Sequence, residues 1–387
     1  MTQTREHSRI VPLRRSFRCA EFFAGIGLVR LSLEWTGGEV LFANDIEPVK
    51  RALYAANFGG DEFRLEDVRN VDGDDVPDVE VATASFPCTD LSLAGNRAGL
   101  AGEQSGMFWE FARVLREMGN RRPKIALLEN VPSFATSHGG SDLCAAVGEL
   151  CDLGYSCDLL ALNASGFVPQ SRLRLFILAA ENPAVAPRRA EPSELRPPWL
   201  IRFREDNQNL SFWTAPIDVP PSTAGTLAGV VERLRPTDDR WWGQERVERF
   251  CASLSGVQTT RLAALQRGRR LRWATAYRRT RHGRAVWEIR SDEISGCLRT
   301  ARGGSSKQAL VQAGRDSLRI RWMTPREYAR LQGVPDKYKL DAVSPNQALF
   351  GLGDAVCVPA VAWVVREAVL PLLAHYGETA KTMAADA

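Results

Sequence analysis

Short apolar runs alternate with stretches of helical spacing over residues 17–181. Apolar runs that end in turn residues are typical of buried strands, whereas apolar residues every three or four positions are typical of amphipathic helices. We expect strands at 18–23, 40–44, 79–84, 125–129, 156–161 and 173–179. We expect helices at 28–35, 48–57, 107–118 and 143–153. This alternation predicts an α/β sheet built from βαβ units.

The pattern changes after residue 180. Residues 183–221 are rich in proline and polar side chains, which predicts a linker and irregular structure. Regular patterning returns at Arg319, and an apolar helix is expected from Pro359 to about His375. We therefore expect three parts, namely a large α/β domain at 1–184, a smaller basic domain at 185–340, and a C-terminal return that completes the first domain at 341–387.

Charge is concentrated in the segment 261–290, although the whole chain of 387 residues has a net charge of only +4. The segment holds ten arginines and a single acid, Glu288, and its aromatic residues are Trp273, Tyr277 and Trp287. Arginines interleaved with aromatic rings favour a phosphate-facing surface, and the alternative is an ordinary solvated surface. The expected phosphate contacts are Arg278, Arg279 and Arg281.

No apolar run reads as a membrane span, and residues 1–18 are polar and arginine-rich, so secretion is not expected. The eight cysteines form no Cys-x-x-Cys pair, so neither a metal site nor a disulfide framework is expected. These features predict a protein of the reducing cytoplasm.

A glycine loop follows the first predicted strand. Ala24-Gly25-Ile26-Gly27 leads into a helix, where glycine lets the backbone approach a ligand at the helix N-terminus. Asp45 ends the next strand and is suited to bind ribose hydroxyls. Because a third glycine and a Walker lysine are absent, an adenosine derivative without pyrophosphate is favoured, and S-adenosylmethionine fits. Asp67 either accepts from the adenine amino group or is a simple loop acid.

A thiol and a carboxyl follow two further strands. Cys88 comes after Pro87, and Glu129 begins Glu129-Asn130-Val131. Thiolate addition to C6 of cytosine makes C5 nucleophilic, and an acid at N3 assists that addition. Each residue alone fits a core cysteine or a strand cap, but the carboxyl ends of adjacent parallel strands are where open α/β sheets place their sites. Residues 90–106 are expected to form a mobile flap.

Two arginines share one side of the strand that follows Gln170. Arg172 and Arg174 are two positions apart, and residues i and i+2 of a strand point the same way. One of them could hold the pyrimidine carbonyl or a flanking phosphate. The alternative is a pair of surface arginines on an edge strand.

Together these motifs resemble those of the prokaryotic DNA (cytosine-5)-methyltransferase family, in family order and over most of the chain. The resemblance is carried by Phe23-Ala24-Gly25-Ile26-Gly27, Asn44-Asp45, Asp67-Val68, Phe86-Pro87-Cys88, Glu129-Asn130-Val131, Gln170 with Arg172 and Arg174, Thr324-Pro325-Arg326-Glu327, and Gly353-Asp354-Ala355-Val356.

The resemblance implies a class I S-adenosylmethionine-dependent fold, with a Rossmann-like sheet, helices on both faces, and a smaller, irregular, strand-rich target-recognition domain. It implies that a cytosine is flipped out of a specific double-stranded DNA sequence, attacked at C6 by Cys88 with Glu129 as the acid, and methylated at C5, which leaves S-adenosylhomocysteine. Arg172 and Arg174 complete the catalytic set. The implied cofactor residues are Phe23, Ala24, Gly25, Ile26, Gly27, Asp45, Ile46, Asp67, Val68, Pro87, Asp354, Ala355 and Val356, and the further DNA contacts are Gln170, Gly303, Gly304 and Ser305. The family's setting implies a restriction–modification or related bacterial defence system, and monomers are common in it.

The chain departs from the family pattern at a few positions. Leu28 replaces a second glycine, Ile46 is a modest adenine-stacking residue, 104–106 lack a usual arginine, and Asp354 replaces an asparagine. None of these changes removes a catalytic group. Two alternatives stay open: methylation of tRNA, for which the Cys-Phe-Thr signature is missing, and a catalytically silent DNA-binding regulator, supported only by Leu28 and Asp354.

Overall fold

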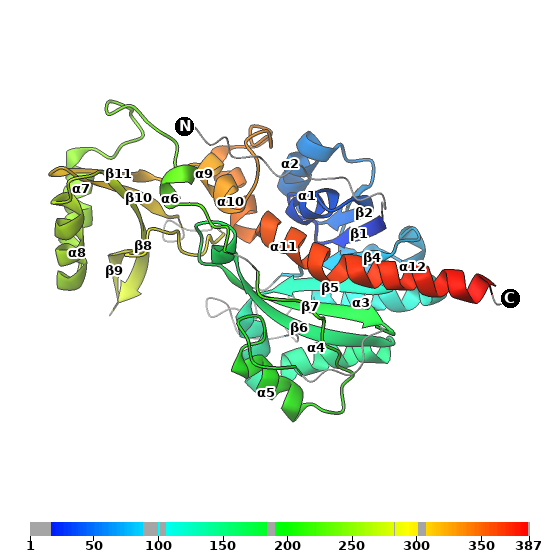
Figure 1. Ribbon diagram of the computed structural model, residues 1–387. Helices are drawn as coiled ribbons and strands as arrows, with labels where there is room; N and C mark the ends of the chain where they lie inside the picture. Colours follow the sequence, from blue (N-terminus) through cyan, green and yellow to red (C-terminus); the bar gives the residue numbers. More distant parts are fainter. Residues whose placement is uncertain are drawn as a thin grey trace, which may run out of the picture.

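The computed structural model describes residues 17–87, 100, 106–183, 190–220, 222–281, 283–300 and 307–385, with side chains as far as residue 379. Two β-sheets organise these residues (Figure 1). The larger sheet has seven strands, and the smaller sheet has four.

The larger sheet has the order β3-β2-β1-β4-β5-β7-β6. Its strands are β1 (Phe17–Phe22), β2 (Gly38–Asp45), β3 (Phe63–Leu65), β4 (Val81–Ala84), β5 (Ile125–Asn130), β6 (Tyr155–Asn163) and β7 (Leu173–Glu181). The first five strands in chain order run parallel, and β7 lies antiparallel between β5 and β6. The strand order reverses at β1 and β4, and such a point opens a ligand-binding crevice at the carboxyl ends of the strands. The expected α/β sheet is confirmed, with β3 as an additional short strand.

Helices cover both faces of this sheet. Adjacent residues of β1 belong to different cores, because Cys19 packs on one face and Ala20 on the other. Helices α3 (Met107–Glu117) and α4 (Ser141–Asp152) pack on the face of Ala20. Helix α1 (Leu28–Glu34) packs on the face of Cys19, and α2 (Pro48–Phe58) adds Leu53 and Tyr54 there. All four helices agree with the sequence pattern to within two residues.

The C-terminal helices complete the face of Cys19. They are α10 (Pro345–Asp354), α11 (Val358–Val364), a π-helical turn η7 (Val365–Val369) and α12 (Leu370–Ala385), drawn in orange and red in Figure 1. The hydroxyl of Ser32 donates to the Val358 carbonyl at 3.1 Å and ties α1 to α11. The run Pro345–Thr379 is long and apolar enough to cross a membrane, contrary to expectation, but 78% of its apolar window is buried in the fold. That burial is typical of a core helix.

The smaller sheet has the order β11-β10-β8-β9 and is antiparallel. Its strands are β8 (Arg272–Arg281), β9 (Arg284–Ile289), β10 (Ala309–Gly314) and β11 (Ser317–Trp322). Helices α7 (Gln244–Ala252) and α8 (Gly256–Gln266) supply Phe250 and Leu262 to a core shared with Trp287 and Ile320. This is the smaller strand-rich lobe that the sequence predicts.

The segment expected to be an irregular linker packs against the larger sheet. It contains helix α5 (Pro198–Asp206), and Arg196 forms a buried ion pair with Asp158 of β6 at 2.5 Å. The remaining helices are α6 (Leu227–Val230), α9 (Pro325–Leu331) and short 3-10 turns at Val68–Asn70, Gly73–Asp75, Gly119–Arg121, Pro132–Gly140 and Ala164–Gly166. The domain limits at 184 and 340 stay predictions, since 195–215 and Tyr338 also contact the larger core.

Candidate active site

The glycine loop lies between β1 and α1 in a left-handed backbone conformation. Phe23, Gly25 and Gly27 have φ values of 58°, 58° and 80°. A side chain at Gly27 would come within 2.5 Å of the Phe58 ring, so the tight turn onto α2 requires glycine there. Asp45 braces the loop, because its Oδ2 accepts from the Gly25 N–H at 2.9 Å. Ile46, next to it, is 59% exposed at this edge of the sheet.

A buried acid beneath the loop was missed by the sequence reasoning. Glu21 of β1 is 1% exposed, and its Oε1 accepts from the Arg30 N–H at 3.2 Å. Its Oε2 has no hydrogen-bond partner among the described residues. Burial raises the pKa of Glu21 to about 8. The sequence does indicate this residue, because Glu21 is an acid within the apolar run of the first strand. Acids are rarely buried unless they are paired or belong to a functional site.

Asp67 is already engaged within its own turn. Its Oδ1 accepts from the N–H of Arg69, and its Oδ2 lies 2.6 Å from the Arg69 guanidinium. This arginine lowers the pKa of Asp67. Val68, beside it, is buried in the core. In this arrangement an adenine amino group would share the Asp67 carboxylate with Arg69.

The tips of β4 and β5 lie side by side. Ala84 pairs with Leu128 in parallel register, so Glu129 lies one position beyond that pair. The side-chain amide of Asn130 donates to the Phe86 carbonyl at 3.2 Å, which holds the chain leading through half-buried Pro87 against β5. Cys88 itself lies outside the described residues, as do Gly303, Gly304 and Ser305.

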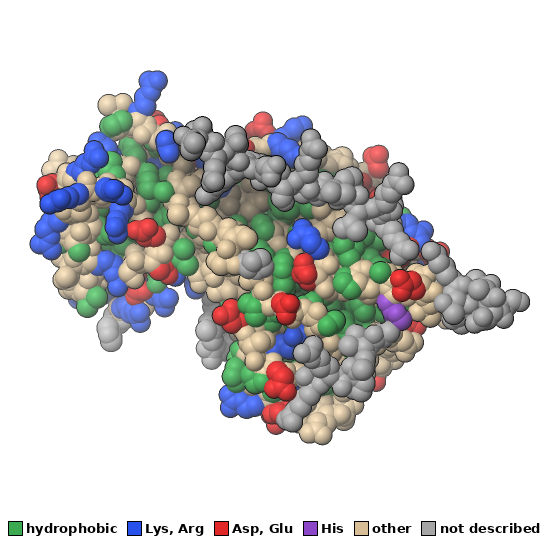
Figure 2. Space-filling model, viewed as in Figure 1, with side chains coloured by type: hydrophobic (Ala, Val, Ile, Leu, Met, Phe, Trp, Pro, Cys, Tyr) green, Lys and Arg blue, Asp and Glu red, His purple; other side chains and the backbone are tan. Residues whose placement is uncertain are grey.

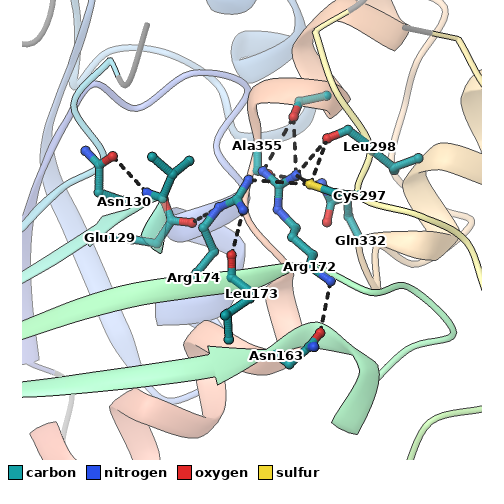
Figure 3. Close-up of polar contacts among 12 residues, drawn as sticks. Glu129, Asn130, Asn163, Arg172, Leu173, Arg174, Cys297, Leu298, Gln332 and Ala355 are labelled. Carbon is teal, nitrogen blue, oxygen red and sulfur yellow. Dashed lines mark hydrogen bonds and ion pairs between the residues drawn. The ribbon is translucent and has the colours of Figure 1, made fainter. Parts of the chain in front are cut away.

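Arg174 of β7 pairs with the predicted acid. Its Nε lies 2.9 Å from Glu129 Oε1, and the two side chains are only 15% and 11% exposed (Figure 3). The contact is an ion pair rather than a well-aligned hydrogen bond, and partial withdrawal from water strengthens the attraction between the two charges. With Val356 and Cys357 they line one small cavity, so the strand tips and the C-terminal return meet at this point.

Arg172 points away from Glu129 and donates to backbone carbonyls. Its guanidinium lies 2.9 Å from the Leu298 carbonyl and 2.6 Å from the Ala355 carbonyl, and burial lowers its pKa (Figure 3). Gly353 provides a third carbonyl at 3.4 Å. Arg172 therefore joins the segment between β9 and β10 of the smaller lobe to the C-terminal return, while Arg174 pairs with the predicted acid.

Cys297 is a second thiol at this site that sequence reasoning did not single out. Its Sγ accepts from Arg172 at 3.4 Å and lies 3.9 Å from Arg174. Burial alone would raise its pKa, but the two arginine charges outweigh burial and the pKa is lowered. The thiol adds partial negative charge between the two guanidiniums.

Gln170 lies inside the protein, which contradicts its expected DNA contact. Its side chain is 0% exposed, and its amide donates to the Leu331 carbonyl at 2.7 Å. Its Oε1 accepts from the Leu298 N–H at 3.1 Å. A buried amide needs such partners, and satisfying them here couples α9 to the segment between β9 and β10 of the smaller lobe.

Lys50 connects Asp354 of the C-terminal motif to Asp45, which contacts the glycine loop. Asp354 accepts a hydrogen bond from the Thr300 hydroxyl, and its Oδ2 lies 3.7 Å from Lys50 Nζ. The same Nζ lies 3.9 Å from Asp45 Oδ2. Ala355 and Val356 follow at the buried side. The structure thus brings the two predicted cofactor acids to one ammonium group, and nothing local in the sequence around Lys50 indicates this.

The arginines of the β8–β9 hairpin are partly neutralised. Arg279 and Arg281 lie 3.2 Å and 2.8 Å from Glu288, the one acid of their segment. Both side chains keep more than half of their surface exposed. Arg278 instead packs over the Trp287 ring at 5.9 Å.

Comparison with known proteins adds a decisive match. The profile of C-5 cytosine-specific DNA methylases covers residues 17–369. The chain belongs to this family. Among curated relatives, type II methyltransferase M.Bsp6I of Bacillus sp. is 27% identical over 88% of this chain and 95% of its own, and M.HhaI of Haemophilus parahaemolyticus is 26% identical over 90% and 92%. Among solved structures, S. pombe Dnmt2 methyltransferase has a TM-score of 0.60 at 18% identity, covering 92% of this chain and 99% of that one.

Family membership makes this protein a DNA cytosine-5 methyltransferase. The matching segment contains both sheets, the strand tips and the C-terminal return as far as residue 369, so the activity and the described site belong to the same part of the chain. The likeness to Dnmt2 concerns the fold alone.

Proposed function

We propose that the methyltransferase uses S-adenosylmethionine to methylate C5 of a cytosine flipped out of a specific double-stranded DNA sequence, through a covalent bond between Cys88 and C6. The observation that carries the proposal is the pairing of β4 with β5. That pairing, with the bond from Asn130 to the Phe86 carbonyl, keeps the segment entering Cys88 beside the Glu129–Arg174 pair.

The chain's own groups then have separate tasks. The Cys88 thiolate adds to C6, and the electron pair released from the C5–C6 double bond makes C5 nucleophilic. Glu129 hydrogen-bonds to N3 and offsets the charge that develops there, while Arg174 fixes the orientation of the Glu129 carboxyl. Bound S-adenosylmethionine supplies an electrophilic methyl group. Loss of the C5 proton to a base then expels the thiolate and restores the double bond.

The residues at the carboxyl ends of β1 and β2 fit an adenosine-bearing donor. Exposed Ile46 and half-buried Phe23 offer apolar surface to an adenine, and Asp45 offers a carboxylate to ribose. The Oε2 of buried Glu21 has no partner among the described residues, and since its pKa of about 8 keeps it protonated at neutral pH, it would donate to an acceptor of the ligand. Asp354 contributes from the C-terminal side, with Ala355 and Val356 behind it.

We place the enzyme in the cytoplasm, on DNA, and in a restriction–modification or related bacterial defence system. The names of the relatives support this, since M.Bsp6I and M.HhaI are type II methyltransferases. A monomer is the proposed state, since monomers are common in this family.

DNA carrying 5-fluorocytosine at the target tests the mechanism. With S-adenosylmethionine, the protein should form a covalent adduct stable to denaturation, because no proton can leave C5. Bisulfite sequencing of DNA from expressing cells first supplies the target. Cys88→Ser should abolish the adduct, and Glu129→Gln should slow its formation strongly. An adduct that persists in Cys88→Ser refutes the assigned nucleophile. The substrate is tested by incubating the protein with labelled S-adenosylmethionine and either DNA or tRNA, and transfer of label to tRNA alone refutes the DNA substrate.

A further inference from the structure

A cavity in the smaller lobe is lined by arginines other than Arg278, Arg279 and Arg281 of the β8–β9 hairpin. It has a volume of about 560 Å³ and lies between the end of α8, the start of β8 and the loop after β9. Five arginines line it, namely Arg261, Arg269, Arg270, Arg272 and Arg290. Figure 2 shows Lys and Arg side chains gathered over this lobe, at the left of the view.

The positive charge of this cavity exceeds its acidic partners. Arg272 lies 3.3 Å from Glu293, and Arg290 pairs with Asp292. Arg269 and Arg270 are exposed, and neither has a carboxylate partner among the residues that the structure describes. Two guanidiniums that lack an acid at a concave surface attract an anion.

The floor of the cavity is apolar and fixed. It includes Leu265, Ala274 and the half-buried ring of Trp273. Trp273 stacks on Trp241 with ring centroids 6.2 Å apart and planes 16° apart, which holds the indole in place. Guanidiniums above an aromatic floor suit a sugar–phosphate chain, whose charged and apolar parts need different surfaces.

The cavity lies at the start of β8, at the opposite end of this strand from the β8–β9 hairpin. Antiparallel pairing places Ala309 opposite Ala276 and Ala313 opposite Arg272. Gln308, just before Ala309, donates to the Gly296 carbonyl at 2.8 Å near the junction of the lobes. Arg272 lies four positions before Ala276, and Arg281 lies five positions after it, so the cavity and the hairpin are on opposite sides of the part of β8 that faces the junction.

We propose that this cavity is a second phosphate-binding site, which holds the backbone of duplex DNA outside the recognition sequence. The proposal rests on the DNA substrate of the proposed function and adds a contact that is independent of base readout. Arg269 and Arg270 precede β8, whereas the hairpin arginines at the other end of β8 share Glu288. The enzyme would thus bind the phosphates of flanking DNA through Arg269 and Arg270.

Binding to duplexes of two lengths tests the proposal. One duplex holds the methylated sequence with its nearest pairs only, and the other extends two helical turns farther on each side. Arg269→Glu with Arg270→Glu should weaken binding to the long duplex at least tenfold, leave the short duplex unchanged, and reduce the salt slope on the long duplex by about 2. Arg235→Glu with Arg249→Glu makes the same charge change at exposed arginines outside the cavity and is the matched control.

An equal loss on both duplexes, or no loss on the long one beyond that of the control, overturns the second site. Methyl transfer to the short duplex is measured in parallel and should be retained by the cavity variant. If the unsubstituted protein fails to methylate either duplex, the proposed function fails instead, so the two failures are distinguishable. Circular dichroism of the variant checks that it folds.

Discussion

Lys50 Nζ lies between two carboxylates of the cofactor site, 3.9 Å from Asp45 and 3.7 Å from Asp354. Asp354 is a position at which the sequence is expected to depart from the family pattern, and its carboxylate shares Lys50 with Asp45. Lys50 is partly buried, with 19% of its side chain exposed, and serves both acids as a counter-ion. The departure at Asp354 is therefore matched by a cation from α2.

Lys50→Met should weaken binding of S-adenosylhomocysteine about fivefold, because Asp45 and Asp354 then repel each other. Partial exposure screens these charges and limits the effect to about 1 kcal/mol. Titration calorimetry measures the affinity directly. Asp354→Asn in the Lys50→Met background should recover most of the loss, and a double variant as weak as Lys50→Met would show that the charges are not coupled.

Arg174 and Arg172 should fail in different ways. Arg174→Met leaves the Glu129 carboxylate without its partner, so kcat should fall about 100-fold with little change in stability. Arg172→Met removes the donor to the buried carbonyls of Leu298, Gly353 and Ala355, which should cost about 3 kcal/mol of unfolding free energy. Urea denaturation and steady-state kinetics separate the two. A fully stable Arg172→Met protein would contradict the joining role of Arg172.

Glu21 should make stability depend on pH. Its folded-state pKa of about 8 lies above the ordinary 4.5, so the folded state binds the proton more tightly than the unfolded state. The protonated Glu21 carboxyl contributes its full amount to the free energy of unfolding below pH 4.5. This contribution is lost as the pH rises to about 8, by at most about 1.4 kcal/mol per pH unit. Glu21→Gln replaces the carboxyl with an amide that does not titrate, so the variant lacks this loss of stability. The urea midpoint of the variant should therefore exceed that of the parent increasingly from pH 6 to pH 8, and a constant difference would contradict the raised pKa.

Arg321 of β11 and Glu327 of α9 form an ion pair in which both side chains are 0% exposed. Glu327 also accepts from the Thr324 N–H at 2.9 Å and the Glu232 N–H at 2.8 Å. Glu327→Gln should destabilise the protein by about 3 kcal/mol, because it leaves a buried guanidinium without its charge partner. Arg321→Met with Glu327→Met should lose less than the sum of the single losses. Additive losses in thermal unfolding would show that the pair is uncoupled.

The sequence predicts the larger sheet well because its signals are local. Alternation within β1 sends Cys19 and Ala20 to opposite cores, and the glycine loop needs the positive φ at Gly27 that its residue type allows. Contacts between distant segments carry no such signal. The burial of Gln170 depends on α9, and the role of Lys50 depends on a helix end some three hundred positions later. The arginines of 261–290 were recognised as a group, but which of them are neutralised depends on cross-strand register.

The Arg172 guanidinium donates hydrogen bonds to the carbonyls of both Leu298 and Ala355. These bonds tie the segment between β9 and β10 to the chain that follows α10, so a rotation of the smaller lobe relative to the larger one would move both segments together. Such a rotation would therefore also displace Val356, which lines the small cavity beside Glu129.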